Sequence, residues 1–257
     1  KPMKNIAKLD KILLFLVFTL LLLHLSCSSN QTSKLEITVA AASSLKDCFA
    51  EMAQEFELET GIKIVFSFGA TANLAKQLEY GAPFDMFAAA DLRSVEQLEQ
   101  KGAIINKKVY AKGRLVLWWP QDRMQKPEKI EDTAKSDFKR IAVAKPETAP
   151  YGMAAKEALE NLDLWKKVEE KIIFSENVNA ARQYAESQNV QLAFIPLSLV
   201  KKGESYLLVD EQLHNPIYQA ICISAHSKQI DSAKVFDRFI SSPKGRLILE
   251  KYGYSIP

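Results

Sequence analysis

Residues 63–78 read KIVFSFGATANLAKQL, and this stretch decides the fold. β-Branched and aromatic residues fill Lys63–Phe68, which predicts a strand. A short helix is predicted near Ala72–Tyr80, stopped by Gly81. Only small or hydroxyl-bearing residues and one asparagine lie between strand and helix, in Gly69–Asn73. The stretch is therefore a strand–turn–helix unit, the building block of an α/β protein.

The same alternation continues on both sides of this stretch. Strands are predicted at Glu36–Ala42, Asp85–Ala90, Arg114–Trp119, Arg140–Ala144, Ile172–Phe174 and Gln191–Ile195, with a further extended run at Ile217–Ser224. Helices are predicted from Leu45 to Thr60, from Asp91 to Lys101, and at Tyr151–Leu162, Asn179–Ser187 and Ser232–Ile240. Strands that alternate with helices indicate mainly parallel sheets covered by helices, and the length of the series favours two lobes.

The N-terminal stretch differs in composition from the rest. Four lysines precede an apolar run from Ile12 to Leu25, which is too short to span a bilayer but is typical of a secretory signal. A buried core helix is the alternative. The run ends at Leu25-Ser26-Cys27, which resembles a bacterial lipobox, although His24 replaces the usual large aliphatic residue. We therefore expect a signal peptide over 1–26, lipidation of Cys27, and a tether over 27–34. Such a protein would be exported, periplasmic or at the cell surface, and anchored to the membrane.

Charge and cysteine content narrow the function classes. The chain has 257 residues, of which 47% are apolar and 25% charged, enough for one large core or two ordinary ones. Loss of residues 1–26 would remove four lysines and one aspartate, leaving 30 basic and 30 acidic residues. A nucleic-acid binder would be expected to keep a basic excess. Export would permit a disulfide between Cys48 and Cys222, but their apolar surroundings favour two buried thiols.

Four strand-to-helix junctions share small or hydroxyl-bearing residues. They are Ala41–Leu45, Phe68–Asn73, Ala149–Gly152 and Glu176–Asn179. The start of a helix offers unpaired N–H groups and the positive end of the helix dipole, so it suits an anion. Each junction taken alone is better explained as an ordinary helix cap. The four junctions together favour an anion-binding site more than any one of them does.

An enzyme is the main rival interpretation. Ser44 is the one tempting nucleophile, and a serine hydrolase needs a histidine base held by a third group. After residue 26 only His214 and His226 remain, both in polar surroundings that predict surface loops. No nucleophile elbow, phosphate-binding loop, dinucleotide fingerprint or metal-ligand spacing is present. The chain is therefore predicted not to be an enzyme and to carry no cofactor.

Residues 35–257 resemble the molybdate-binding protein of bacterial molybdate ABC importers. The resemblance rests on Ser67–Leu78, Gly81–Phe87, Ala90-Asp91, the Ala-Ala-Ser-Ser-Leu-Lys-Asp turn at 41–47, Ala149–Gly152 with Ala154–Leu159, and Lys251–Tyr254. It implies a two-lobed, type II periplasmic binding protein-like α/β fold with the ligand cleft between the lobes. Lobe 1 would comprise 35–113 with 217–257, and lobe 2 would comprise 114–216. The resemblance also implies a monomer that captures molybdate or tungstate and delivers it to an inner-membrane permease.

The resemblance also implies which residues bind the oxyanion. Ser44 and Thr71 would donate both hydroxyl and backbone N–H, and Tyr151 and Val178 would donate backbone N–H. Pro196 stands where some members carry a tyrosine that reaches the ligand. Either the Tyr151 hydroxyl replaces it, or the Tyr151 ring only packs in the cleft wall.

The sequence leaves open which anion the protein binds. Another anion, such as sulfate, phosphate or a small organic acid, could occupy the same fold. An organic acid would favour an arginine clamp, and none of the four junctions carries an arginine. The sensing half of a transcription regulator is a further alternative, which the predicted signal peptide argues against.

The lipid anchor is directly testable. We expect the mature protein from membrane fractions to begin at a lipidated Cys27, because one lipid followed by a polar tether would hold it at a membrane surface. Mass spectrometry of the N-terminal peptide measures the modification. An unmodified Cys27 in that fraction would contradict the prediction.

Overall fold

The computed structural model describes residues 35–120 and 125–256. The predicted signal peptide, Cys27 and the tether lie outside these residues. The strands are β1 (Glu36–Ala42), β2 (Lys63–Gly69), β3 (Met86–Ala89), β4 (Ile104–Gly113), β5 (Leu115–Trp118), β6 (Ile141–Ala144), β7 (Ile172–Ser175), β8 (Leu192–Pro196), β9 (Tyr206–Leu208) and β10 (Ile217–Ser224). The α-helices are α2 (Lys46–Thr60), α3 (Thr71–Glu79), α4 (Arg93–Gln100), α5 (Pro150–Asn161), α6 (Trp165–Val168), α7 (Val178–Glu186), α8 (Ile230–Ile240) and α9 (Pro243–Lys251). Short 3-10 helices are η1 (Ser43–Leu45), η2 (Ile130–Ala134), η3 (Glu169–Lys171), η4 (Leu197–Leu199) and η5 (Glu211–Leu213).

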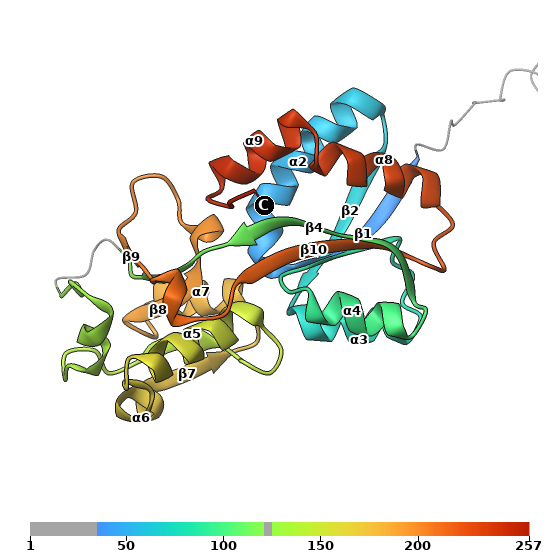
Figure 1. Cartoon of the computed structure of the whole chain (residues 1–257). Coiled ribbons are helices and arrows are strands. Elements are labelled where there is room, and N and C mark those ends of the chain that lie inside the picture. The colour runs from blue at the N-terminus through green and yellow to red at the C-terminus, as the bar shows by residue number, and fades with distance from the viewer. Residues whose placement is uncertain (1–34, 121–124, 257) are drawn as a thin grey trace, which may run out of the picture. The chain divides into compact units, whose positions relative to one another are not determined.

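The strands form two five-stranded sheets, ordered β2-β1-β3-β10-β4 and β7-β6-β8-β5-β9 (Figure 1). In the first sheet β1 is parallel to β2 and β3, and β10 is antiparallel to β3 and β4. The second sheet likewise has two parallel and two antiparallel pairings. The α/β class is confirmed, and the sheets are mixed rather than mainly parallel. We use lobe 1 for residues 35–113 with 217–256 and lobe 2 for 114–216; that these lobes move as separate bodies stays a prediction.

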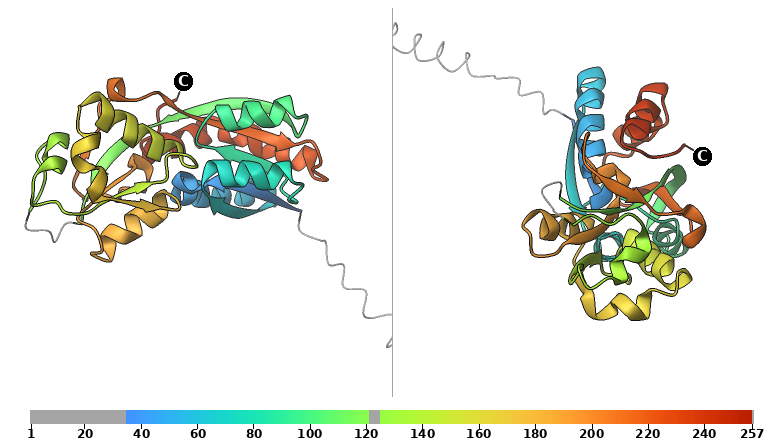
Figure 2. Two further views of the ribbon diagram at one scale, coloured as in Figure 1. Left: turned by 90° about the horizontal axis from the view of Figure 1, so that it is seen from below. Right: turned by 90° about the vertical axis from the view of Figure 1, so that its left-hand side faces the viewer.

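The inner strands of the first sheet, β1, β3 and β10, are largely buried, since helices cover the side chains that point to either face. One face packs against α2, α8 and α9, which lie together on one side of the sheet, while α3 and α4 lie on the other (Figures 1 and 2). Residues of β1 show the alternation: Val39 belongs to the cluster with α2, and Ala40 to the cluster with α3 and α4. This two-sided burial explains the nearly continuous apolar run that predicted β1.

Four of the α-helices and strands were not predicted from the sequence: β4, α6, β9 and α9. β4 carries three lysines and exposes several of its residues, so its apolar pattern is weak. It forms because β10 supplies a long antiparallel partner at the end of the sheet. α9 was left as a tail, although Ser242 and Pro243 form a helix start, with the Ser242 side chain accepting from the N–H of Gly245.

The chain crosses between the lobes at two neighbouring points. Gly113 ends β4 and pairs with Ile217 at the start of β10, so the two crossings lie side by side. A Cβ atom on Gly113 would lie 1.9 Å from the Tyr151 hydroxyl oxygen. A residue larger than glycine therefore does not fit at this crossing while the Tyr151 ring keeps its place.

The cysteines and histidines can now be compared with their predictions. Cys48 and Cys222 are free and buried, as predicted. Burial raises the pKa of both thiols, that of Cys222 to about 12. The prediction that His214 lies in a surface loop is wrong: the side chain is buried, and its Nδ1 is 2.8 Å from the Asn215 carbonyl oxygen.

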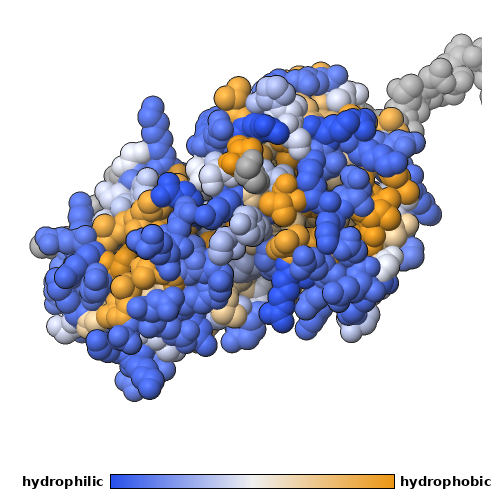
Figure 3. Space-filling model, in the orientation of Figure 1, coloured by the Kyte–Doolittle hydropathy of each residue, from blue (hydrophilic) through white to orange (hydrophobic). Residues whose placement is uncertain are grey.

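The surface of the molecule is mostly hydrophilic on the face shown in Figure 3, where apolar residues form separate patches. Leu247 on α9 and Tyr218 on β10 are among the exposed large apolar side chains. In the part of the chain that the structure describes, no helix has the length and apolar character needed to cross a bilayer.

A substitution at Gly152 tests how closely the start of α5 packs against the end of β6. Its Cβ position would lie 2.0 Å from the Ala144 carbonyl oxygen at the end of β6. Gly152→Ala should therefore force helix and strand apart and lower the stability by about 1–3 kcal/mol, as overpacking does. Thermal unfolding followed by circular dichroism should show a Tm several degrees lower. Met153→Ala, at the exposed neighbouring position, is the control and should leave the Tm nearly unchanged.

Candidate functional site

The starts of four helices meet around one small cavity. It is lined by Ala42, Ser43, Ser44, Gly69, Ala70, Thr71, Ala90, Ala149, Pro150, Tyr151 and Val178, and has a volume of about 10 Å³. This is about the room that one water-sized sphere needs. The four predicted site residues therefore share one cavity, with Ser44 and Thr71 from lobe 1 and Tyr151 and Val178 from lobe 2.

The hydroxyl groups of Ser44 and Thr71 belong to residues that line this cavity. The Ser44 side chain is 1% exposed, and its Oγ has no hydrogen-bond partner among the described residues. A buried hydroxyl without a partner lowers stability by about 1–3 kcal/mol, so it is rare unless a ligand or water binds it. Thr71 Oγ1 accepts a hydrogen bond from the Ala90 N–H at 3.3 Å. That bond uses a lone pair and leaves the Thr71 proton free to be donated.

Backbone N–H groups complete the set of donors. The first N–H groups of a helix have no acceptor within the helix, and they lie at the positive end of its dipole. Thr71 and Val178 are the first residues of α3 and α7. α5 begins with Pro150, which has no N–H, so Tyr151 carries the first donor of that helix. At α7 the Asn177 side chain caps the N–H of Ala180 at 3.1 Å and leaves the earlier donors to the cavity.

No charged side chain lines the cavity. Tyr151 is its one titratable lining residue, and burial raises the pKa of its hydroxyl well above the usual value, so it stays neutral. Among the described residues no group of three or more histidines, cysteines, aspartates or glutamates could hold a metal ion. The cavity can therefore attract an anion through neutral donors and helix dipoles.

The Tyr151 hydroxyl points toward the crossing between the lobes. It lies against Gly113, which is not among the residues that line the cavity. It makes no hydrogen bond of normal geometry to the described residues, and the Tyr254 and Tyr110 hydroxyls are its polar neighbours. This position favours the alternative in which the ring packs in the cavity wall and only the Tyr151 N–H faces a ligand.

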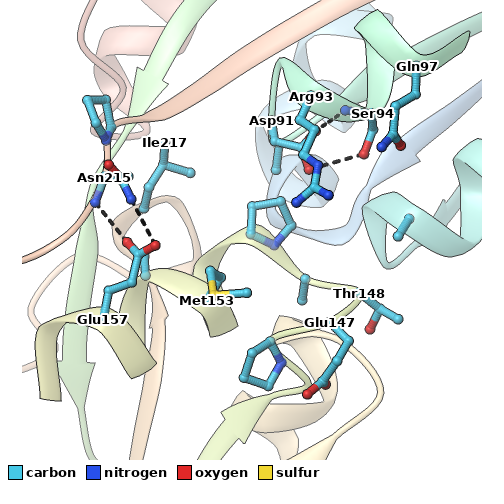
Figure 4. Close-up of a pocket in the computed structure, with 17 residues that line it drawn as sticks. Asp91, Arg93, Ser94, Gln97, Glu147, Thr148, Met153, Glu157, Asn215 and Ile217 are labelled. Atoms are coloured by element: carbon cyan, nitrogen blue, oxygen red, sulfur yellow. Dashed lines mark hydrogen bonds between the residues drawn. The ribbon is translucent and has the colours of Figure 1, made fainter. Parts of the chain in front are cut away.

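A wider cleft of about 430 Å³ adjoins the cavity and shares Ala90, Ala149 and Pro150 with it. The cleft separates α4 of lobe 1 from the 146–150 loop and α5 of lobe 2 (Figure 4). Asp91 accepts from the N–H and hydroxyl of Ser94 at 2.6 and 3.2 Å, which confirms its predicted role as a helix cap. Burial raises the pKa of Asp91, an effect that these bonds oppose.

Direct hydrogen bonds join the two lobes around the cavity. The Asn179 Nδ2 donates to the Ser43 carbonyl at 3.0 Å, and the Ala72 N–H donates to the Thr148 carbonyl at 3.1 Å. The Ser44 carbonyl accepts from Ser198 Oγ at 2.7 Å. It also accepts at 3.0 Å from the Tyr254 hydroxyl, which comes from the C-terminal segment of lobe 1. Sequence reasoning missed Ser198 and the roles of Tyr254 and Asn179, since no local pattern marks a contact with a residue far away in the chain.

Comparison with known proteins extends over almost the whole described chain. The family model of the bacterial extracellular solute-binding proteins matches residues 37–255. The molybdate-binding protein ModA of Azotobacter vinelandii is 33% identical over 232 residues, which cover 86% of this chain and 90% of that protein. YvgL of Bacillus subtilis (strain 168), whose name describes an ABC transporter substrate-binding lipoprotein, is 30% identical over 248 residues, which cover 92% of this chain and 95% of that protein. The solved periplasmic molybdate-binding protein of Azotobacter vinelandii gives a TM-score of 0.81 at 27% identity, covering 86% of this chain and 99% of the other.

These matches decide the class of protein. The structural likeness confirms the predicted periplasmic binding protein-like fold. The family consists of solute-binding proteins, which confirms the expectation that the chain is not an enzyme. The chain belongs to the bacterial extracellular solute-binding proteins and, within them, to the ModA family of molybdate-binding proteins.

Proposed function

We propose that this protein captures molybdate outside the cytoplasmic membrane and delivers it to an ABC importer, with Ser44, Thr71, Tyr151 and Val178 as the residues that bind the ion. One observation carries the choice of site: the buried Ser44 Oγ, which has no partner among the described residues, lies in a cavity where helix starts from both lobes meet. The names of the molybdate-binding relatives support the choice of ligand.

Neutral donors suit a doubly charged oxyanion. Burial of an anion is unfavourable unless several hydrogen bonds replace its water, and bonds to an ionised acceptor are the stronger kind. Donors held by helix ends provide these bonds without ordering long charged side chains. A site with donors only also disfavours phosphate, which usually carries a proton near neutral pH and needs an acceptor for it. Sulfate has shorter bonds and would reach fewer donors, whereas tungstate is nearly the size of molybdate and should bind as well.

The small volume of the cavity bears on how the ion reaches it. Room for about one water-sized sphere is less than a tetrahedral oxyanion fills, so the lobes have to part before the ion is admitted. The bound ion would then hold donors of both lobes and favour the closed arrangement, which it contacts more fully than the open one. The closed surface is what an inner-membrane permease would recognise.

The location proposed for the protein follows from its N-terminal stretch. Residues 1–26 have the order of a signal peptide, and Cys27 follows in a sequence that resembles a lipobox. The name of the Bacillus subtilis relative describes a lipoprotein. A lipid on Cys27 would keep the binding protein close to its permease.

Replacing the two hydroxyl donors tests the site. Ser44→Ala and Thr71→Ala should each weaken molybdate binding by about 1.5–3 kcal/mol, the value of a hydrogen bond to a charged group. This corresponds to a Kd roughly ten- to a hundredfold higher, measurable by isothermal titration calorimetry. Without ligand, Ser44→Ala should not lower the Tm, because it removes a buried hydroxyl that has no partner.

A matched serine provides the control for this experiment. Ser187 is exposed, and its hydroxyl bonds to backbone carbonyls of α7 and to the Asn189 side chain, far from the cavity lining, so Ser187→Ala should bind molybdate as the wild type does. Wild-type affinity in both Ser44→Ala and Thr71→Ala would exclude this cavity as the binding site.

A panel of anions tests the choice of ligand. A ligand that binds only the folded protein stabilises that protein and raises the Tm. The stabilisation grows with the logarithm of the ligand concentration divided by the Kd. Molybdate and tungstate should give large thermal shifts at micromolar concentration, and sulfate and phosphate small ones at most. A larger shift with sulfate or phosphate than with molybdate would refute the proposed ligand while leaving the site in place.

A further inference from the structure

The hydrogen bonds between the lobes use none of the donors assigned to the ligand. Asn179 donates through its side-chain amide, Ser198 through its hydroxyl, and Ala72 through an N–H next to that of Thr71. Their acceptors are backbone carbonyls of Ser43, Ser44 and Thr148. Each lobe 1 junction is thus joined directly to lobe 2 by groups other than the donors assigned to the ion.

Asn179 also controls the direction of a ligand donor. The Ser43 carbonyl and the Ser44 N–H belong to one planar trans peptide, so they point in opposite directions. A bond from Asn179 to the carbonyl, at 3.0 Å, therefore sets the direction of the Ser44 N–H. Asn179 lies on the first turn of α7, directly after Val178, which lines the cavity.

Ser198 holds the next peptide group. Its hydroxyl and that of Tyr254 both donate to the Ser44 carbonyl, and they are 3.1 Å from each other. Both side chains are buried, at 5% and 3% exposure. Tyr254 comes from lobe 1, as Ser44 does, whereas Ser198 comes from lobe 2, so of these two bonds to the Ser44 carbonyl only that from Ser198 crosses between the lobes.

We propose that Asn179 and Ser198 are positioning residues that hold the lobes closed and aim the Ser44 donors into the cavity, independently of any ligand. The part of this inference that concerns the ion rests on the proposed function, and the part that concerns closure does not. If only the closed form binds well, the apparent Kd equals the intrinsic Kd divided by the closed fraction. Loss of either residue would then weaken the binding of every oxyanion by the same factor.

The amide of Ala72 reports closure without any ligand. It lies in the first turn of α3, where an N–H has no acceptor within the helix, and its acceptor is the Thr148 carbonyl of the other lobe. Hydrogen exchange of this amide, followed by NMR on the ligand-free full-length protein, therefore measures opening of the lobes. Asn179→Ala and Ser198→Ala should each speed its exchange about fivefold, the factor that corresponds to one ordinary hydrogen bond.

Matched controls separate closure from general damage. Asn189 and Ser187 bond only within lobe 2, so Asn189→Ala and Ser187→Ala should leave Ala72 exchange unchanged. Ser198→Thr keeps the hydroxyl and should restore slow exchange. Amides of β1 must stay protected in every variant, which shows that lobe 1 is folded. If Asn179→Ala does not fold, Asn179→Asp removes the donor at nearly the same size.

Binding measurements complete the test. Asn179→Ala and Ser198→Ala should raise the Kd for molybdate and for tungstate by one common factor of at most about five, because the apparent Kd rises only as far as the closed fraction falls. Unchanged Ala72 exchange in both variants would overturn the proposal, as would a change in the molybdate-to-tungstate ratio, which would mean direct contact with the ion. Failure of the wild-type protein to bind any oxyanion would refute the proposed function alone, because the exchange result is obtained without ligand.

Discussion

The constraint on which this structure depends is that the start of a helix leaves N–H groups without acceptors. In most proteins side chains or water supply those acceptors. Here four helix starts meet around one cavity, and the residues that line it carry no charged side chain. Small residues such as Ala42, Ala70 and Ala149 keep the donors uncovered. The cavity is therefore complementary to a negative group that brings its own acceptors, and the ModA family to which the chain belongs is named for such a group.

The α/β architecture is what brings the helix starts together. In each lobe the parallel strands end at the same edge of the sheet, and the helix that follows each strand begins there. β4 and β10 then place the two edges opposite each other, since both crossings between the lobes lie side by side at Gly113 and Ile217. The fit at this point is tight, because the Tyr151 ring reaches from the cavity wall to Gly113. The same residue thus contributes to the cavity through its N–H and to the crossing through its hydroxyl.

Because the donors at the cavity are neutral, different groups can bind the ion and hold the two lobes together. Charged ligand residues in the cavity would repel or attract one another as the lobes approach. Instead, carbonyl groups that point away from the cavity accept bonds from the opposite lobe, as Ser43 does from Asn179 and Thr148 from Ala72. A peptide group has its N–H and C=O on opposite sides, so one backbone segment can face the ion and the other lobe at once.

The sequence by itself determined the strand–helix alternation, the α/β class, and four of the residues that line the cavity, because these depend on local patterns: apolar periodicity, helix caps and the family motifs around Ser44 and Thr71. It could not reveal β4, whose lysine-rich sequence becomes a strand only beside β10, nor that the sheets are mixed. Only the tertiary structure decided that the Tyr151 hydroxyl points to Gly113, that His214 is buried, and that Asn179 and Ser198 reach residues 136 and 154 positions away. The physical reason is that such contacts arise from the packing of whole lobes. The residues next to them in the sequence do not specify which distant residue they will meet.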